Sequence, residues 1–297
     1  MAGVFVMDLE ALPRYINERR VRIQWNGCFT SGYSSVRGTE PGIQDTFFAV
    51  ASLKMLNAAS PDDEIVSFIR NHEHLDLNRA YYAAGCLRLA GCIPELNGGK
   101  LEWWYRGEHH EIDCFIPGTP LIRYFEYDLY GMYGSSIFSS SLGTLLKRLK
   151  LGAVSSGEEM DGIVRSALLL LEGSRELVRA HISLEILDAI AERGFLVKLP
   201  ESHIKPLSRL LESCETVRGY TPTPESTTET LESTYAGCMI ARRLKEREPP
   251  GLRSFVDLLQ NDNGGFRRSP FGGISALEHC YLALRVAGRD RESDSVR

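Results

Sequence analysis

GGFRRSPFGGISALEHCYLAL, residues 264–284, joins a glycine-rich loop to a segment with helical periodicity. Leu277 and Tyr281 are four residues apart, so they lie on one face of the expected helix. Glu278 and His279 fall in its first turn. They are either solvated residues that favour the positive end of the helix, or chemical groups at the mouth of a cavity.

The same helix pattern occurs at four places in the chain, where a polar side chain is followed three residues later by an aromatic one. The pairs are Asp45 and Phe48, Asn78 and Tyr81, Glu232 and Tyr235, and Glu278 and Tyr281. Weaker copies at 138–152 and 179–194, the second containing His181, fit the long gap between the middle pairs. Self-similarity of this kind is typical of helical repeat proteins, and it predicts about six helical pairs.

A second type of helix, with an amphipathic pattern, alternates with the first. In SPDDEIVSFIRNHE, residues 60–73, we expect Ser60 as the N-cap and Pro61 at the first helical position. Similar segments run over 200–214 and 252–266. No sustained alternation of apolar and polar residues predicts a set of strands. The pattern therefore predicts an all-α protein.

Composition and organisation favour one globular domain. The chain has 297 residues, of which 43% are hydrophobic and 25% charged, values that are ordinary for a soluble protein. No shift in composition marks an internal boundary, so residues 1–297 are expected to form a single domain. Residues 1–12 are expected to be a short lead, and residues 289–297 a frayed polar tail.

Charge and cysteine content limit the kinds of partner and the cellular compartment that we expect. A net charge of −5 without a basic run argues against a nucleic-acid partner. No apolar stretch reaches the roughly 18 residues of a membrane span, and the N-terminus lacks the layout of a signal peptide. Seven cysteines without C-x-x-C spacing indicate reduced thiols, which predicts a cytoplasmic protein.

The alternation of these two helix types, with GGF before the last one, resembles the prenyltransferase and squalene-oxidase repeat family. The matching stretches are QDTFFAVASLKML (44–56), ESTYAGCMIARRL (232–244) and residues 252–288. The resemblance covers about residues 39–89 and 231–288 by letters, and the middle of the chain by spacing. It implies a single-domain α/α toroid of about six helical hairpins, in which the second helices surround a central cavity.

The resemblance implies an isoprenoid-like or otherwise apolar ligand in that cavity, with transfer or cyclisation chemistry. Glu232, Glu278 and Asp45 are then the candidate catalytic residues, because carboxylates at the rim can act as acids or stabilise a cation. Aromatic and histidine side chains would line the cavity. These candidates for substrate binding are Tyr235, Tyr281, Tyr81, Phe48, His181, Trp103 and Trp104.

This sequence departs from the zinc-binding pattern of the family that it resembles. Related prenyltransferases hold zinc with an Asp-x-Cys and a His, and the corresponding positions here are Glu232, Thr234 and Glu278. We therefore expect chemistry without the usual zinc and no firmly implied cofactor. One alternative is a divergent metal-dependent β-like subunit, with zinc or magnesium on Glu232, Glu278 and His279 and a helical-repeat partner subunit. Another is a non-catalytic toroid for interaction or ligand carriage.

LEWWYRGEHHEIDCF, residues 101–115, concentrates aromatic and metal-ligand residue types. His109, His110 and Cys114 could in principle bind a metal. The same letters are compatible with a short β-hairpin that turns at Arg106-Gly107.

NDNGGFRRSPFGG, residues 261–273, carries two arginines among glycines. A phosphate could lie against Arg267, Arg268 and backbone amides. The other interpretation is a packed loop that joins two helices.

Overall fold

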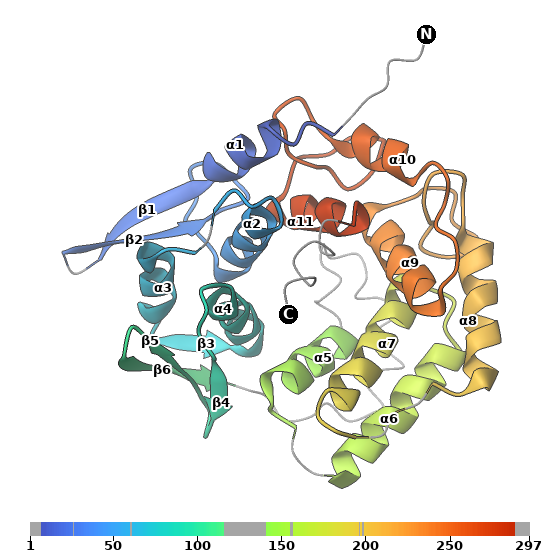
Figure 1. Cartoon of the computed structure of the whole chain (residues 1–297), viewed down its shortest axis with the longest axis horizontal. Helices are drawn as coiled ribbons and strands as arrows, with labels where there is room; N and C mark the ends of the chain where they lie inside the picture. The colour runs from blue at the N-terminus through green and yellow to red at the C-terminus, as the bar shows by residue number, and fades with distance from the viewer. Residues whose placement is uncertain are drawn as a thin grey trace. The chain divides into compact units, whose positions relative to one another are not determined.

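A computed structural model describes residues 7–288 of the chain except 26, 60, 116–140, 155–156, 196 and 198 (Figure 1). The chain divides into two compact units. Unit 1 comprises Met1–Phe115 with Gly251–Arg297, and unit 2 comprises Ile116–Pro250. The expected polar tail, the first six residues of the lead and the expected N-cap Ser60 lie outside the described residues.

The described part of unit 1 combines helices with two small sheets. Its helices are α1 (Ala11–Asn17), α2 (Ile43–Met55), α3 (Asp63–Arg70), α4 (Leu77–Leu89), α10 (Leu252–Leu259) and α11 (Leu277–Val286). Its strands are β1 (Arg20–Trp25), β2 (Cys28–Tyr33), β3 (His74–Asp76), β4 (Glu95–Asn97), β5 (Lys100–Tyr105) and β6 (Glu108–Phe115). Strands β1 and β2 form an antiparallel hairpin, and the second sheet has the order β3-β6-β5-β4.

The prediction of an all-α toroid is wrong, because the protein is a mixed α/β structure. The strands show little alternation of apolar and polar residues, because several of them bury few of their side chains. In β1, for example, no residue is fully buried. The hairpin alternative for residues 101–115 is confirmed: β5 and β6 pair antiparallel through Trp103 and His110. Arg106 and Gly107 turn the chain with φ of 51° and 83°, the left-handed pair that a tight hairpin turn requires.

The helix starts agree with the expected first-turn positions of the polar residues. Asp45, Glu232 and Glu278 each lie in the first turn of their helix. One start differs: α3 begins at Asp63, and the side chain of Asp62 accepts a hydrogen bond from the backbone N–H of Ile65. Asp62 therefore serves as the N-cap in place of Ser60.

Aromatic rings from α2, α4 and α11 form the core of unit 1. Phe48 is fully buried, and its ring centroid lies 5.4 Å from that of Tyr82 and 5.4 Å from that of Tyr281. Phe47 packs beside them, 5.9 Å from Tyr281. Gly85 on α4 makes room for it, since a Cβ there would lie 2.6 Å from the Phe47 ring. These contacts join segments at the two ends of the chain into one core.

Unit 2 consists, in its described part, of helices packed around α7. They are α5 (Ser141–Leu151), α6 (Gly157–Glu172), α7 (Leu177–Ala191), α8 (Glu201–Cys214) and α9 (Leu231–Leu244). Helix α7 contacts each of the other four. Buried residues occupy all sides of α7, which explains why it has no amphipathic stripe.

A glycine followed by an aromatic residue recurs before three of the helices. Tyr33, Tyr220 and Phe266 are buried, and α2, α9 and α11 begin ten or eleven residues after them. The preceding glycines are Gly32, Gly219 and Gly265, and at each a Cβ would come within 2.9 Å of a neighbouring side chain. In two copies a helix threonine accepts a hydrogen bond from the tyrosine N–H: Thr46 from Tyr33 at 2.9 Å and Thr234 from Tyr220 at 3.2 Å. The repeat therefore includes the loop as well as the helix.

Glu176, just before α7, should make unit 2 less stable at neutral pH than at acidic pH. Its Oε2 atom is buried without a hydrogen-bond partner among the described residues, and burial raises the pKa of the carboxyl. A raised folded-state pKa means that ionisation opposes folding, so the cost appears as pH rises above the ordinary value of 4.5. Glu176→Gln should raise the melting temperature at pH 7, with a gain that shrinks below about pH 4. Thermal melts across this range test it, and a gain independent of pH would contradict it.

Candidate functional site

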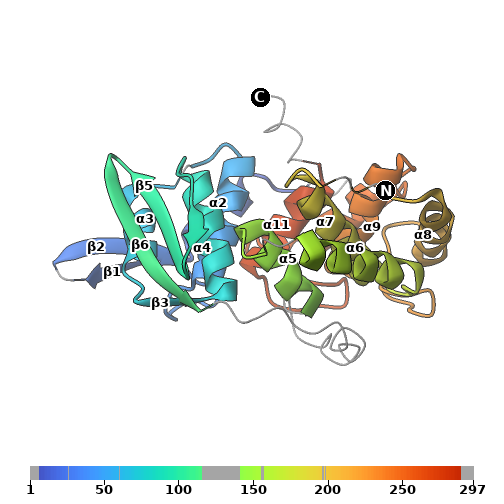
Figure 2. The same ribbon diagram turned by 90° about the horizontal axis from the view of Figure 1, so that it is seen from below.

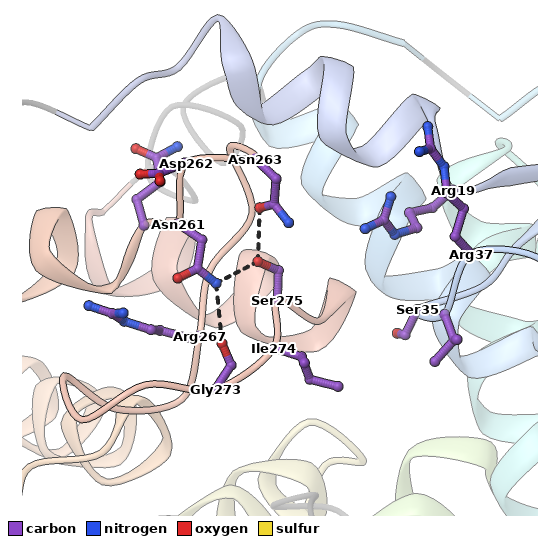
Figure 3. Close-up of a pocket in the computed structure, with 12 residues that line it drawn as sticks. Arg19, Ser35, Arg37, Asn261, Asp262, Asn263, Arg267, Gly273, Ile274 and Ser275 are labelled. Carbon is purple, nitrogen blue, oxygen red and sulfur yellow. Dashed lines mark hydrogen bonds between the residues drawn. The ribbon is translucent and has the colours of Figure 1, made fainter.

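Unit 1 contains a pocket of about 710 Å³ where three segments distant in the sequence meet (Figure 3). The residues come from the end of α1, the β2–α2 loop and the α10–α11 loop. They are Arg19, Ser35, Val36, Arg37, Gln260, Asn261, Asp262, Asn263, Arg267, Gly273, Ile274 and Ser275. We call this site the arginine pocket. Figure 3 shows Arg19 and Arg37 across the opening from Asn261, Arg267 and Gly273.

The α10–α11 loop holds its shape through a side-chain network. Asn261 Nδ2 donates to Ser275 Oγ at 2.8 Å, and Ser275 Oγ donates to Asn263 Oδ1 at 3.0 Å (Figure 3). Asn263 Oδ1 also accepts from the backbone N–H of Gly265 at 3.0 Å. The loop is therefore pre-formed, which lowers the entropy cost of ordering it around a ligand.

Two glycines allow this loop to pack against α1. Gly264 has φ of 85°, and a Cβ there would lie 2.7 Å from the Ala11 carbonyl oxygen. At Gly265 a Cβ would lie 2.5 Å from Tyr15 Cζ and 2.7 Å from Ser275 Cβ. The GGF stretch thus packs the α10–α11 loop against α1, as the interpretation of residues 261–273 as a packed loop predicted. Arg267, which follows this stretch, lines the pocket.

The opposite wall is positioned by Asp45. Its two carboxylate oxygens accept hydrogen bonds from the Ser35 backbone N–H at 2.9 Å and the Ser35 hydroxyl at 2.6 Å. Asp45 is not among the lining residues, whereas Ser35 is. The structure therefore shows this predicted catalytic residue as a buttress for the β2–α2 loop.

The charge of the pocket is positive. Three arginines line it against one acid, Asp262, which gives a formal charge of +2. Arg37 Nη2 pairs with Glu18 at 3.0 Å, but both side chains are largely exposed, and exposed pairs contribute little free energy. Arg267 Nη2 donates to the Leu258 carbonyl at 2.9 Å. The net charge thus favours an anionic ligand.

Two of the guanidinium groups retain unused donors. Among the described residues, the buried Nε atoms of Arg19 and Arg267 have no hydrogen-bond partner. The Arg19 guanidinium lies 4.3 Å from the centroid of the buried Tyr15 ring, which holds it in place by a cation–π contact. A buried donor without an acceptor costs free energy, and an anion or a water molecule would remove that cost.

The edge of the arginine pocket is apolar. Val36 and Ile274 line it and are 53% and 79% exposed. Phe271, in the same loop as Ile274, is 82% exposed. A ligand in this pocket would therefore meet cationic and amide groups inside and aliphatic groups at the rim.

The residues predicted to share one cavity fall in both units, and none of them lines the arginine pocket. Those in unit 2 are Glu232, Tyr235 and His181. There His181 and Tyr235 meet edge to face at 5.3 Å, and all three side chains are buried. In unit 1, Phe48 and Tyr281 belong to the aromatic core, and the Tyr281 hydroxyl accepts from Arg285 at 2.9 Å.

The two tryptophans of β5 lie on opposite faces of their sheet. Trp103 is 1% exposed and Trp104 is 65% exposed, as expected for adjacent strand residues. Each packs against its cross-strand histidine with tilted rings. The ring centroids are 5.5 Å apart for Trp103 and His110 and 5.2 Å apart for Trp104 and His109. The two histidines therefore diverge, and they cannot share a ligand on one face.

The described residues contain neither a cluster of metal ligands nor a helix that could span a membrane. No group of three or more His, Cys, Asp or Glu side chains there could hold a metal ion. The helices within those same ranges are too short or too polar to cross a bilayer.

A smaller pocket of about 190 Å³ lies between α3 and the β5–β6 hairpin. Asp63 forms an ion pair there with Arg106 at 2.9 Å and also accepts a hydrogen bond from the Tyr105 hydroxyl. Desolvation, reinforced by Arg70, lowers the pKa of His110, so that histidine is neutral at pH 7. The paired charges leave this pocket without the positive excess of the arginine pocket.

Arg19 and Arg37 line the pocket although no sequence pattern predicted a role for them. Arg19 is directly followed by Arg20 and Arg37 stands alone, and neither belongs to a recognisable binding motif. Of the two arginines that the phosphate interpretation of residues 261–273 named, Arg267 lines the pocket and Arg268 does not. Comparison with known proteins adds no relative: no family model matches this chain, and neither a curated protein nor a solved structure shows significant similarity to it.

Proposed function

We propose that unit 1 binds a small anionic ligand, with a phosphate or carboxylate group, in the arginine pocket. The observation that carries the proposal is the lining itself: three arginines against a single acid in a pocket with a pre-formed wall. Arginine is suited to this task because its planar guanidinium offers several donors in the geometry of a carboxylate or phosphate.

The size of the pocket argues for a ligand larger than a bare ion. About 710 Å³ lies within the usual range of roughly 300–1,000 Å³ for small-molecule sites. Ser35 and Gln260 supply neutral polar groups beside the arginines. A phosphorylated or carboxylated metabolite with further polar groups fits this combination.

The isoprenoid-like ligand and its transfer or cyclisation chemistry remain a separate proposal that rests on the family resemblance alone. The same holds for the alternatives of a metal-dependent β-like subunit and of a non-catalytic carrier. Zinc analysis of the purified protein separates the metal alternative: stoichiometric zinc that is lost in Glu232→Ala would support it.

The proposed anion site is tested by titrating the protein with inorganic phosphate, pyrophosphate and citrate in a calorimeter. We expect at least one of them to bind with an affinity that falls as salt rises. The double variant Arg19→Gln/Arg37→Gln should bind it about ten- to a hundredfold more weakly, since a hydrogen bond to a charged group contributes about 1.5–3 kcal/mol.

The matched control is Arg14→Gln/Arg253→Gln, which removes the same charge from exposed arginines of α1 and α10 outside the pocket. It should leave the affinity unchanged. Equal weakening by the control and by the pocket variant would show only a general charge effect, and absence of binding by all three anions would refute the proposal.

A further inference from the structure

One face of the larger sheet of unit 1 is exposed and acidic, and its register explains why. In β4, β5 and β6, Glu95 pairs with Glu102, which in turn pairs with Glu111. Cross-strand partners project to the same face of a sheet, so the three carboxylates form a row. Trp104 and His109 are paired on that face too, as are Lys100 and Asp113.

We call this surface the acidic sheet face. It consists of Glu95, Lys100, Glu102, Trp104, His109, Glu111, Asp113 and Phe115. The helices of unit 1 that pack on the sheet, α3 and α4, lie on its other side, where Leu101, Trp103 and Ile112 are buried (Figure 1). Figure 2, turned by 90° from Figure 1, shows α4 beside β5 and β6.

Two large aromatic side chains are left in solvent on this face. Trp104 is 65% exposed and Phe115 is 74% exposed. The core does not require them there, because the buried side of the sheet has its own tryptophan in Trp103. Exposed tryptophan surrounded by charged residues is typical of recognition surfaces, where aromatic residues supply much of the binding energy.

The charges of the face are poorly compensated. Four acids stand against Lys100, a formal charge of −3. Lys100 pairs with Glu111, and its Nζ lies 4.0 Å from Asp113. For Glu95 no ion pair occurs within the described residues. Glu102 accepts a hydrogen bond from Asn97 at 3.2 Å and lies 3.8 Å from His109 Nε2. Like charges that face each other across strands are destabilising, and Lys100 pairs with only one member of the glutamate row, so partner cations would offset the remaining repulsion.

We infer that the acidic sheet face binds a basic segment of a partner protein, rich in arginine or lysine. Its cations would pair with the glutamate row, and one would lie over the Trp104 ring. Charge complementarity selects this occupant, because nucleic acid and anionic membranes are repelled by the face. The surface shares no residue with the arginine pocket, so this inference does not depend on the proposed anion site.

The test measures binding of a labelled peptide of alternating arginine and serine by fluorescence anisotropy, with the full chain. Glu95→Gln/Glu102→Gln/Glu111→Gln should weaken binding about tenfold, since three exposed ion pairs with the peptide would be lost. Removing the repulsive row should leave the fold intact. Trp104→Ala should weaken binding about two- to fivefold through loss of the cation–π contact.

The matched control is Glu172→Gln/Glu192→Gln/Glu212→Gln, which removes the same charge from exposed positions of unit 2. It should retain binding of the arginine peptide, and a glutamine–serine peptide should bind neither protein. Equal weakening by the two triple variants would overturn the inference. So would self-association of the wild type that the sheet variant abolishes, because the occupant would then be a second copy of this chain.

Discussion

Phe48→Ala is expected to lower the free energy of unfolding of unit 1 by about 3–5 kcal/mol. The side chain is fully buried, and its ring packs against Tyr82 of α4 and Tyr281 of α11. Truncation would leave a cavity that three separate helices cannot close, since each is also held by its own loops. Urea denaturation monitored by circular dichroism measures the loss.

The matched control for this change is Phe271→Ala, which deletes the same atoms from a side chain that is 82% exposed. It should alter stability by less than about 0.5 kcal/mol. A comparable loss in the two variants would show that the aromatic core does not stabilise unit 1.

Gly265→Ala is expected to destabilise unit 1 by about 1–3 kcal/mol and to impair the arginine pocket as well. The added Cβ would lie 2.5 Å from Tyr15 Cζ and 2.7 Å from Ser275 Cβ, and both residues are buried. Tyr15 supports Arg19, and Ser275 links Asn261 to Asn263. The added methyl group would therefore displace both Arg19 and the α10–α11 loop, which lie on opposite sides of the arginine pocket.

Gly162→Ala provides the comparison, since a Cβ there meets no atom within 4 Å and the residue lies inside α6. Alanine in that helix should stabilise by up to about 1 kcal/mol. Differential scanning calorimetry reports stability, and anion titration reports the pocket. Normal stability and normal anion binding in Gly265→Ala would refute the close packing of this loop.

The helices were largely predictable, because helix formation depends on neighbours three and four residues away. The first-turn positions of Asp45, Glu232 and Glu278 follow from that local pattern, and the structure confirms them. The hairpin at Arg106-Gly107 could be read in the same way as an alternative. The remaining strands could not, since β1 buries none of its residues and β3 has only three, which leaves too little alternation to recognise.

The spacing of the aromatic residues did not decide their role. Phe48 and Tyr281 have the spacing of a cavity lining, yet within unit 1 they pack on each other. An aromatic residue one turn into a helix satisfies either role equally well. Only its neighbours in space distinguish a lining residue from a core residue.

By itself, the sequence determined the helices and offered the β5–β6 hairpin as an alternative, because each depends on residues close together in the chain. The tertiary structure decided which charges meet. Arg19, Arg37 and Arg267 share a pocket only because α11 packs on α2 and the Gly264-Gly265 loop packs on α1. Such convergence depends on contacts between distant segments, and no local pattern encodes it.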